Sequence, residues 1–184
     1  MLILGIESTA KAASAALCQS PGSEDELWDV YDMAGHRTGR THRRAEALQP
    51  GDRHLCVHVW VQNAAGDYLI TRRSARKSMA GLWECTGGCV VAGEESLNAA
   101  LREVREETGL VLDPERAELL LCWEGEFFLC DVYRFRQEFS PEQLHLQPEE
   151  TDGARLCSAE EIRALAASGQ FVKLPYLETV LGED

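Results

Sequence analysis

The chain has 184 residues, 45% of them hydrophobic, which suits one globular domain with a sizeable core and leaves little room for two. Its net charge of -13 argues against a broad surface for a nucleic-acid polymer or an anionic membrane, because either surface needs a positive field. No apolar run approaches the roughly 18 residues that a membrane span needs. The apolar start, MLILGI, has no basic region before it, so we expect a soluble, cytoplasmic protein.

Seven cysteines are scattered along the chain, and no two of them form a CxxC pair. An odd number without such a pair predicts neither a disulfide framework nor a four-ligand zinc site. We therefore expect reduced thiols.

One stretch departs from the acidic balance of the chain. Between residues 37 and 77, nine basic residues stand against three acids, a local charge of +6. Such a segment could hold a small polyanion such as a diphosphate, or it could be a solvated face that balances the acidic remainder. The nine are Arg37, Arg40, Arg43, Arg44, Arg53, Arg72, Arg73, Arg76 and Lys77.

Strand patterns occur on both sides of the middle of the chain. The first is predicted over residues 26–31, with a turn at 33–36. Residues 55–62 and 68–71 are rich in β-branched and aromatic side chains, and the turn residues between them predict a hairpin. Further strand candidates are residues 119–122, 126–128 and 131–135.

Two helices are predicted. The first runs from about residue 96 to residue 108, where Gly109 is placed to end it. The second begins at a capping box of Ser158 and Glu161 and runs to about residue 168, with Gly169 as its stop. Strands that surround one helix and precede another indicate a mixed sheet packed with helices, an α/β fold.

The first helix gathers three carboxylates on one face. At about 100° per residue, Glu103, Glu106 and Glu107 fall within about 100° of one another, roughly 120° from the middle of the apolar stripe. Like charges at this spacing repel, and a divalent cation offsets that cost, because Mg²⁺ takes oxygen ligands from carboxylates, water and substrate phosphates. By itself, however, the helix fits an ordinary solvated face at least as well, since Glu is a good helix former.

The residues around that helix resemble the signature of the Nudix hydrolase family at every specified position. The signature is G, five residues, E, seven residues, R-E-aliphatic, one residue, E-E, one residue, G-aliphatic. Its positions here are Gly88, Glu94, Arg102, Glu103, Val104, Glu106, Glu107, Gly109 and Leu110. The resemblance covers roughly residues 24–184. It implies a Nudix-type α/β/α sandwich with a mixed β-sheet, a bound divalent cation, and hydrolysis of a small substrate, a nucleoside diphosphate linked to another group.

The same resemblance implies roles for individual residues. Glu103, Glu106 and Glu107 would be ligands of Mg²⁺ or Mn²⁺, of one ion or more, and the Gly88 carbonyl would add a further ligand. Glu103 would also position or deprotonate the attacking water. Arg102, four residues before Glu106, is placed to brace the acidic cluster.

Further candidates lie outside the helix. We expect Glu94 to order the loop before it. Some family members take a general base from a later loop, where the candidates here are Glu149 and Glu150. Phosphate-binding candidates follow a strand near the box, and the sequence does not choose among them; they are Arg72, Arg73, Arg76 and Lys77.

A rival enzyme of the same fold is isopentenyl-diphosphate isomerase, which the stretches around residues 28–39, 53–55 and 71–74 also resemble. The isomerase uses a histidine-rich metal site and a catalytic cysteine. His54 fits one of its histidines, but Ala47 stands where the partner would be, and Cys85 and Cys89 lie near the cysteine's place without aligning. Because the isomerase lacks the intact Glu-Glu pair of this chain, hydrolysis is favoured.

A third alternative is a Nudix module that binds a nucleotide without cleaving it. Such a module is expected to have lost carboxylates from the signature, and none is lost here. Specificity resides in loops, so the substrate stays open. The sequence is compatible with a homodimer without predicting one.

Residues 1–18 resemble the first strand, turn and second strand of the actin-like ATPase fold in the bacterial protein that supports threonylcarbamoyl modification of tRNA. Nothing after Ser23 continues that fold, and a phosphate-binding hairpin without its domain cannot build a site. We therefore expect an appended segment over residues 1–21, as a hairpin or disordered, and a Nudix domain over residues 22–184.

Overall fold

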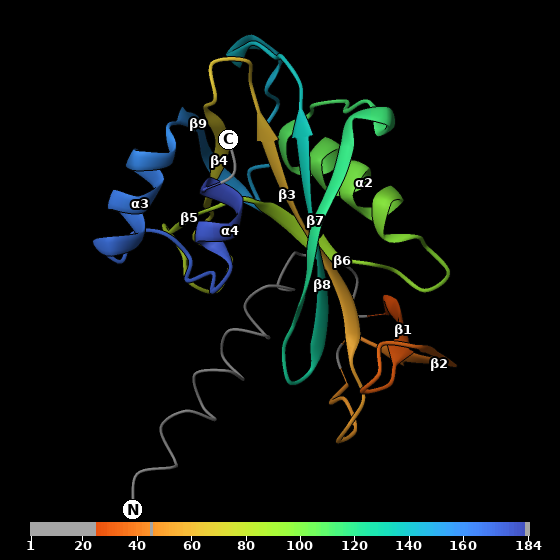
Figure 1. Cartoon of the computed structure of the whole chain (residues 1–184). Coiled ribbons are helices and arrows are strands. Elements are labelled where there is room, and N and C mark those ends of the chain that lie inside the picture. The colour runs from red at the N-terminus through yellow and green to blue at the C-terminus, as the bar shows by residue number, and fades with distance from the viewer. Residues whose placement is uncertain (1–24, 45, 183–184) are drawn as a thin grey trace, which may run out of the picture.

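A mixed β-sheet with helices on both of its faces forms the centre of the molecule (Figure 1). The computed structural model describes residues 25–44 and 46–182, so the segment predicted over residues 1–21 lies outside the described residues. The strand order is β5-β4-β3-β8-β7, with β6 paired to β3 and β9 paired to β4. β3 and β8 run parallel and the other pairs antiparallel, which confirms the predicted mixed sheet.

The elements follow one another as a run of strands broken by one long helix. In the part of the chain that the structure describes, no helix combines the length and the apolar character needed to cross a membrane. The strands and helices are β1 (Leu27–Tyr31), β2 (Arg37–Arg43), β3 (His54–Gln62), β4 (Tyr68–Arg73), β5 (Trp83–Glu84), β6 (Thr86–Cys89), α2 (Ser96–Thr108), β7 (Ala117–Glu124), β8 (Phe128–Arg136), β9 (Thr151–Cys157), α3 (Ala159–Ala167) and α4 (Leu177–Leu181).

The central strand β3 is buried along all but its last residue, because both of its faces are covered. Val57 and Val59 lie in the same apolar cluster as Val104 of α2. Trp60, which points to the opposite face, lies in a second cluster with Ile162 of α3. Figure 1 shows the same division, with α2 on one face of the sheet and α3 and α4 on the other.

The predicted helices are confirmed at their ends. α2 spans the predicted residues, and Gly109 ends it with a φ of 76°, which glycine adopts without strain. The capping box of Ser158 and Glu161 opens α3. β6 precedes α2 and pairs with β3, Gly88 lying opposite Val57, which brings the start of the signature to the middle of the sheet.

Other expectations need correction. The separate strand predicted over residues 126–128 is wrong, because the Gly125 N–H donates to the Phe128 carbonyl at 2.9 Å and closes a turn between β7 and β8. The patterns also missed β2, β6, β9 and α4. β2 is polar and exposed, and β6 and β9 carry glycines, so none of the three shows the apolar alternation of a typical strand.

The basic stretch over residues 37–77 does not form one patch. Its first residues belong to β2, which pairs with β1 in a separate two-stranded sheet, whereas its last four lie in or just after the end of β4. Each of the nine basic side chains has an acidic partner within 4.0 Å. The charge of the stretch is therefore largely balanced locally.

Candidate active site

Arg102 on α2 gathers three carboxylates at one side of the site. Its guanidinium donates to Glu94 at 3.0 Å, to Glu103 at 2.8 Å and to Glu106 at 3.1 Å. It also donates to the backbone carbonyl of Cys89 at 3.1 Å. The helix is thereby tied to the loop that precedes it, which is the geometry expected of a bracing arginine.

Lys77 gathers a second set of carboxylates. Its ammonium lies 3.2 Å from Glu107, 3.0 Å from Glu150 and 3.5 Å from Glu84. All four side chains are buried, and the lysine side chain is only 3% exposed. Arg73, also buried, pairs with the second oxygen of Glu84 at 2.5 Å. The structure thus places Glu150 beside the helix carboxylate Glu107.

Backbone contacts hold Glu150 in this position. The N–H of Gln147 donates to the Glu107 carbonyl at 3.2 Å, which docks the loop against the end of α2. The N–H of Ser74 donates to the Glu150 carbonyl at 2.9 Å, and the Ser74 hydroxyl donates to the Glu149 carbonyl at 2.5 Å. Of the two candidate bases, the side chain of Glu150 lies in the buried cluster and that of Glu149 is exposed.

Gly88 is in tight contact with Glu103. A Cβ added at residue 88 would overlap the Glu103 carboxylate, so the absence of a side chain makes room for that carboxylate beside β6. Glu106, one helical turn after Glu103, has a half-exposed side chain. Gly88 and Glu103 therefore meet at one edge of the site, whereas Glu107 lies in the cluster around Lys77.

The four phosphate-binding candidates divide into two pairs. The guanidinium groups of Arg72 and Arg76 are on exposed side chains, paired with Asp152 at 2.6 Å and Glu149 at 2.7 Å. Arg73 and Lys77 are buried among carboxylates. Arg72 and Arg76 are thus the two of the four that present a cationic group to solvent.

Burial makes the carboxylates of this site hard to ionise. It raises the pKa of Glu103 to about 7, although the neighbouring Arg102 cation opposes the shift. It likewise raises the pKa of Glu107 and of Glu150 above the ordinary value, with Lys77 opposing both shifts. A bound cation would favour the charged carboxylates, so the site as a whole is electrostatically suited to one.

The side chains present fit a hard divalent cation. The Oε2 atom of Glu107 is buried and has no hydrogen-bond partner among residues 25–44 and 46–182. An ionised oxygen in that position is costly unless a positive group contacts it. Glu103 and Glu106 carry further carboxylate oxygens on the same helix, although the three helix carboxylates do not all lie within 4.8 Å of one another. Oxygen ligands are those that Mg²⁺ and Mn²⁺ prefer.

Glu84 is a member of the buried cluster that the sequence patterns did not single out. It lies in the short strand β5 beside Trp83 and contacts both Lys77 and Arg73. Its neighbours in sequence, Trp83 and Cys85, could have indicated that Glu84 is buried. Because carboxylates are rarely buried unless they are paired, the same pattern would have predicted a cationic partner.

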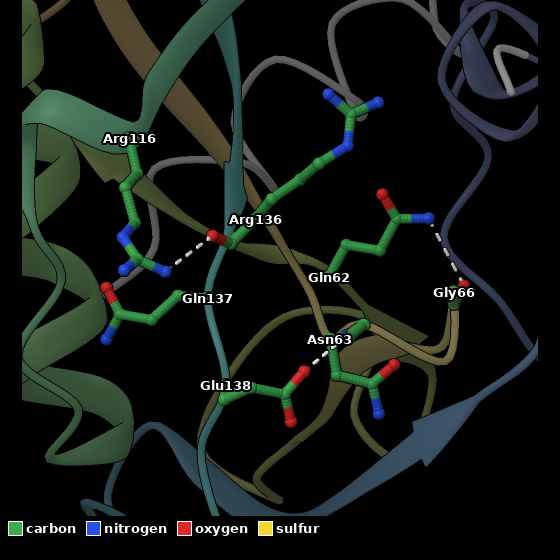
Figure 2. A pocket seen from close by; sticks show the side chains of 8 residues that line it. Gln62, Asn63, Gly66, Arg116, Arg136, Gln137 and Glu138 are labelled. Carbon is green, nitrogen blue, oxygen red and sulfur yellow. Dashed lines mark hydrogen bonds between the residues drawn. The ribbon is translucent and has the colours of Figure 1, made fainter.

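A hollow of about 480 Å³ lies away from this cluster (Figure 2). It is lined by Gln62, at the end of β3, and by Arg116 and Arg136. Gln62 is five residues along β3 from Val57, the partner of Gly88, which corresponds to roughly 16 Å. Another hollow, of about 490 Å³, runs along the outer side of α2 and is lined in part by Arg102 and Glu106. This second hollow adjoins the carboxylates.

Two residues of the isomerase alternative, His54 and Cys89, adjoin the carboxylate site, and the Cys89 carbonyl accepts from Arg102. A ring nitrogen of His54 and the sulfur atoms of Cys56 and Cys89 lie within 4.8 Å of one another, and all three residues are buried. Burial lowers the pKa of His54 to about 4, so its ring is neutral at neutral pH.

Comparison with known proteins identifies the class of enzyme. The model of the NUDIX domain family matches residues 52–178. An uncharacterized Nudix hydrolase of Listeria monocytogenes is 35% identical over 153 residues, covering 82% of this chain and 89% of that protein. A crystal structure of a Deinococcus radiodurans protein has the same fold, with a TM-score of 0.69 at 24% identity over 84% of this chain and 97% of that one. The protein belongs to the Nudix hydrolases, a family of pyrophosphohydrolases.

The comparisons also bear on the alternatives. An isopentenyl-diphosphate Delta-isomerase of Cutibacterium acnes is 34% identical over 100 residues, which cover 53% of this chain and 50% of that protein. The predicted similarity to the isomerase is thus confirmed as a distant one. Nothing in these comparisons supports the actin-like resemblance of residues 1–18, which lie outside the described residues.

Proposed function

We propose that the protein hydrolyses the diphosphate bond of a nucleoside diphosphate linked to another group, or of a related small diphosphate, with Mg²⁺ or Mn²⁺. One observation carries the proposal: Glu107 and Glu150 share a buried pocket around Lys77, with the Oε2 atom of Glu107 left for a cation. Glu103 lies in the same helix one turn earlier and is held by Arg102.

In this proposal Glu103, Glu106 and Glu107 hold the cation, with the Gly88 carbonyl as a further ligand. A bound divalent cation shields phosphate oxygens, favours ionisation of water and stabilises the leaving phosphate. Arg102 keeps the Glu103 and Glu106 carboxylates on one side of α2, at 2.8 and 3.1 Å from its guanidinium. Ligands oriented in advance in this way lose less conformational freedom when the ion binds.

Glu150 is the residue we propose as general base. As the oxygen of water bonds to phosphorus, the water proton passes to the Glu150 carboxylate, and the anhydride P–O bond breaks with its electron pair leaving on the departing phosphate. Burial raises the pKa of Glu150 above its ordinary value, and a carboxylate with a higher pKa is a stronger base. The loop contacts through Ser74 and Gln147 keep it beside the helix carboxylates.

Arg72 and Arg76 are the cationic side chains that we propose to contact substrate phosphates. Both are exposed, and both lie in or near the segment that carries Lys77. The Arg72 guanidinium lies 5.9 Å from the centre of the half-buried Trp83 ring, so a cation and an aromatic face occur together at the edge of the site. Arg73 is buried against Glu84, so in this proposal it supports the neighbouring side chains and does not contact the substrate.

The test is a panel of nucleoside triphosphates, nucleotide sugars, dinucleotides and isoprenoid diphosphates, each incubated with Mg²⁺ or Mn²⁺, with the released products identified. Metal-dependent release of two phosphate-bearing products, or of phosphate, is the expected result. Tight metal-dependent binding without turnover of any compound would instead establish the non-catalytic binding module.

The second candidate function, diphosphate isomerisation, is favoured by the similarity to the Cutibacterium acnes isomerase. Interconversion of isopentenyl and dimethylallyl diphosphate without release of phosphate would establish it. The complete set of signature carboxylates favours hydrolysis over this reaction.

A further inference from the structure

Lys77 is enclosed by acidic side chains and does not reach solvent. Its ammonium has carboxylates of three different segments around it: Glu84 of β5, Glu107 of α2 and Glu150 of the loop before β9. Lysine is rarely buried unless it is paired in this way. A phosphate-binding role would require an ammonium group directed at the substrate, whereas this one is directed at the protein's own carboxylates.

The carboxylates around Lys77 are not equivalent. Glu84 contacts Lys77 with one oxygen and Arg73 with the other, so both of its oxygens are engaged. Glu107 contacts Lys77 through Oε1, and its Oε2 has no hydrogen-bond partner in the described part of the chain. Glu84 therefore anchors the lysine, while Glu107 has one oxygen for the lysine and one for another cation.

Metal ligands must be deprotonated, and with all three carboxylates ionised the charges of this cluster do not balance without a further cation. Arg73 and Lys77 supply two positive groups, and Glu84, Glu107 and Glu150 three negative ones, all buried. Removing the lysine charge would leave three buried carboxylates with a single buried guanidinium, and uncompensated buried charge strongly destabilises a fold. A divalent cation at Glu107 would restore positive charge, but it would also lie close to the ammonium and repel it.

We propose that Lys77 is a resident counter-ion of the metal site, which holds Glu84, Glu107 and Glu150 together before the divalent cation binds and then competes with that cation for Glu107. Lys77 is thus a positioning residue. The inference rests on the proposed function in one respect, since both assume that a divalent cation binds at these carboxylates.

The test compares K77M with K77R. K77M replaces the ammonium group by an unbranched apolar side chain, whereas K77R keeps the positive charge. K173M is the control, because Lys173 is an exposed lysine outside the cluster. Thermal unfolding of the full chain is followed after treatment with a chelator, and again with saturating Mg²⁺. Binding of Mn²⁺ alone is measured by calorimetry.

For K77M we expect the metal-free Tm to fall by roughly 10 °C, the rise in Tm on adding Mg²⁺ to exceed that of the unmodified protein, and Mn²⁺ to bind about 10-fold more tightly. K77R should recover most of the metal-free Tm, and K173M should behave like the unmodified protein. An unchanged metal-free Tm and an unchanged metal response in K77M, with only the KM for substrate raised, would overturn the proposal in favour of a phosphate-binding lysine.

A double substitution keeps the proposal testable if K77M cannot be obtained without metal. Adding E107Q removes one of the carboxylates that the lysine balances, so the metal-free Tm of the double variant should exceed that of K77M, or the double variant should fold where K77M does not. A double variant no more stable than K77M would contradict the counter-ion role. Because these readouts use no substrate, failure of every diphosphate to react would leave them intact.

Discussion

The carboxylate of Glu103 occupies the space that a side chain on Gly88 would need. The two residues come from different elements: Gly88 from β6, paired to the central strand, and Glu103 from the middle of α2. The helix can therefore place its first carboxylate directly against the sheet. A glycine at residue 88 is required by this close approach, and no positive φ is involved.

Gly88→Ala should therefore displace Glu103 and weaken both metal binding and turnover. We expect turnover to fall by about 100-fold or more, since small displacements of a catalytic group cost about that much. Calorimetric titration with Mn²⁺ and product formation at saturating substrate are the measurements. Gly153→Ala is the control, because a Cβ there meets its neighbours at ordinary contact distances of 3.5 Å and beyond. Equal effects of the two substitutions would contradict the displacement of Glu103 as the cause of the lost activity.

Glu106→Gln and Glu107→Gln should each reduce turnover by at least about 100-fold, because each removes the negative charge of a proposed metal ligand while preserving the shape of the side chain. A circular dichroism spectrum like that of the unmodified protein would show that each variant is folded. Glu95→Gln, at the exposed position just before α2, serves as the control and should retain full activity. Near-normal turnover in both helix variants would contradict the assignment of Glu106 and Glu107 as metal ligands.

Glu150→Gln should lower kcat strongly, whereas Glu149→Gln should change it little. The two residues are neighbours in sequence, but only Glu150 lies in the buried cluster at 3.0 Å from Lys77. Glu149 is exposed and paired with Arg76. Steady-state kinetics on the same substrate decide between them, and a larger loss of kcat in Glu149→Gln would assign the base to the outer residue instead.

Acid should destabilise the protein through His58. This residue is buried against the Tyr176 hydroxyl, and burial, with a contribution from the Arg73 charge, lowers its pKa from 6.5 to about 4. Between pH 6.5 and about pH 4 the His58 ring binds a proton in the unfolded chain but not in the folded one. The stability that His58 contributes above pH 6.5 is therefore lost as the pH falls through this window. The loss from this residue should reach at most about 3 kcal/mol.

Urea unfolding at several pH values between 4.5 and 7.5 measures this loss. The free energy of unfolding of His58→Asn should depend less on pH than that of the unmodified protein. His36, which is exposed, provides the control substitution His36→Asn. An identical pH dependence in all three proteins would show that other groups cause the acid sensitivity.

Local patterns were sufficient for much of the fold and for part of the site. The spacing of apolar residues and Gly109 located α2, and Ser158 with Glu161 located the start of α3, because helix periodicity and capping depend on residues within a few positions of one another. The signature from Gly88 to Leu110 indicated the family for the same reason. Polar or glycine-bearing strands such as β2 and β9 were missed, since pairing with a neighbouring strand defines them.

Only the tertiary structure distinguished residues that look alike in sequence. Arg72 and Arg73 are adjacent, as are Arg76 and Lys77, yet one member of each pair is exposed and the other is buried. Strand alternation decides this for Arg72 and Arg73 in β4, whereas the turn after β4, closed by the Lys77 N–H donating to the Ser74 carbonyl, decides it for Arg76 and Lys77. The meeting of Glu84, Glu107 and Glu150 around Lys77 likewise depends on three separate segments packing together.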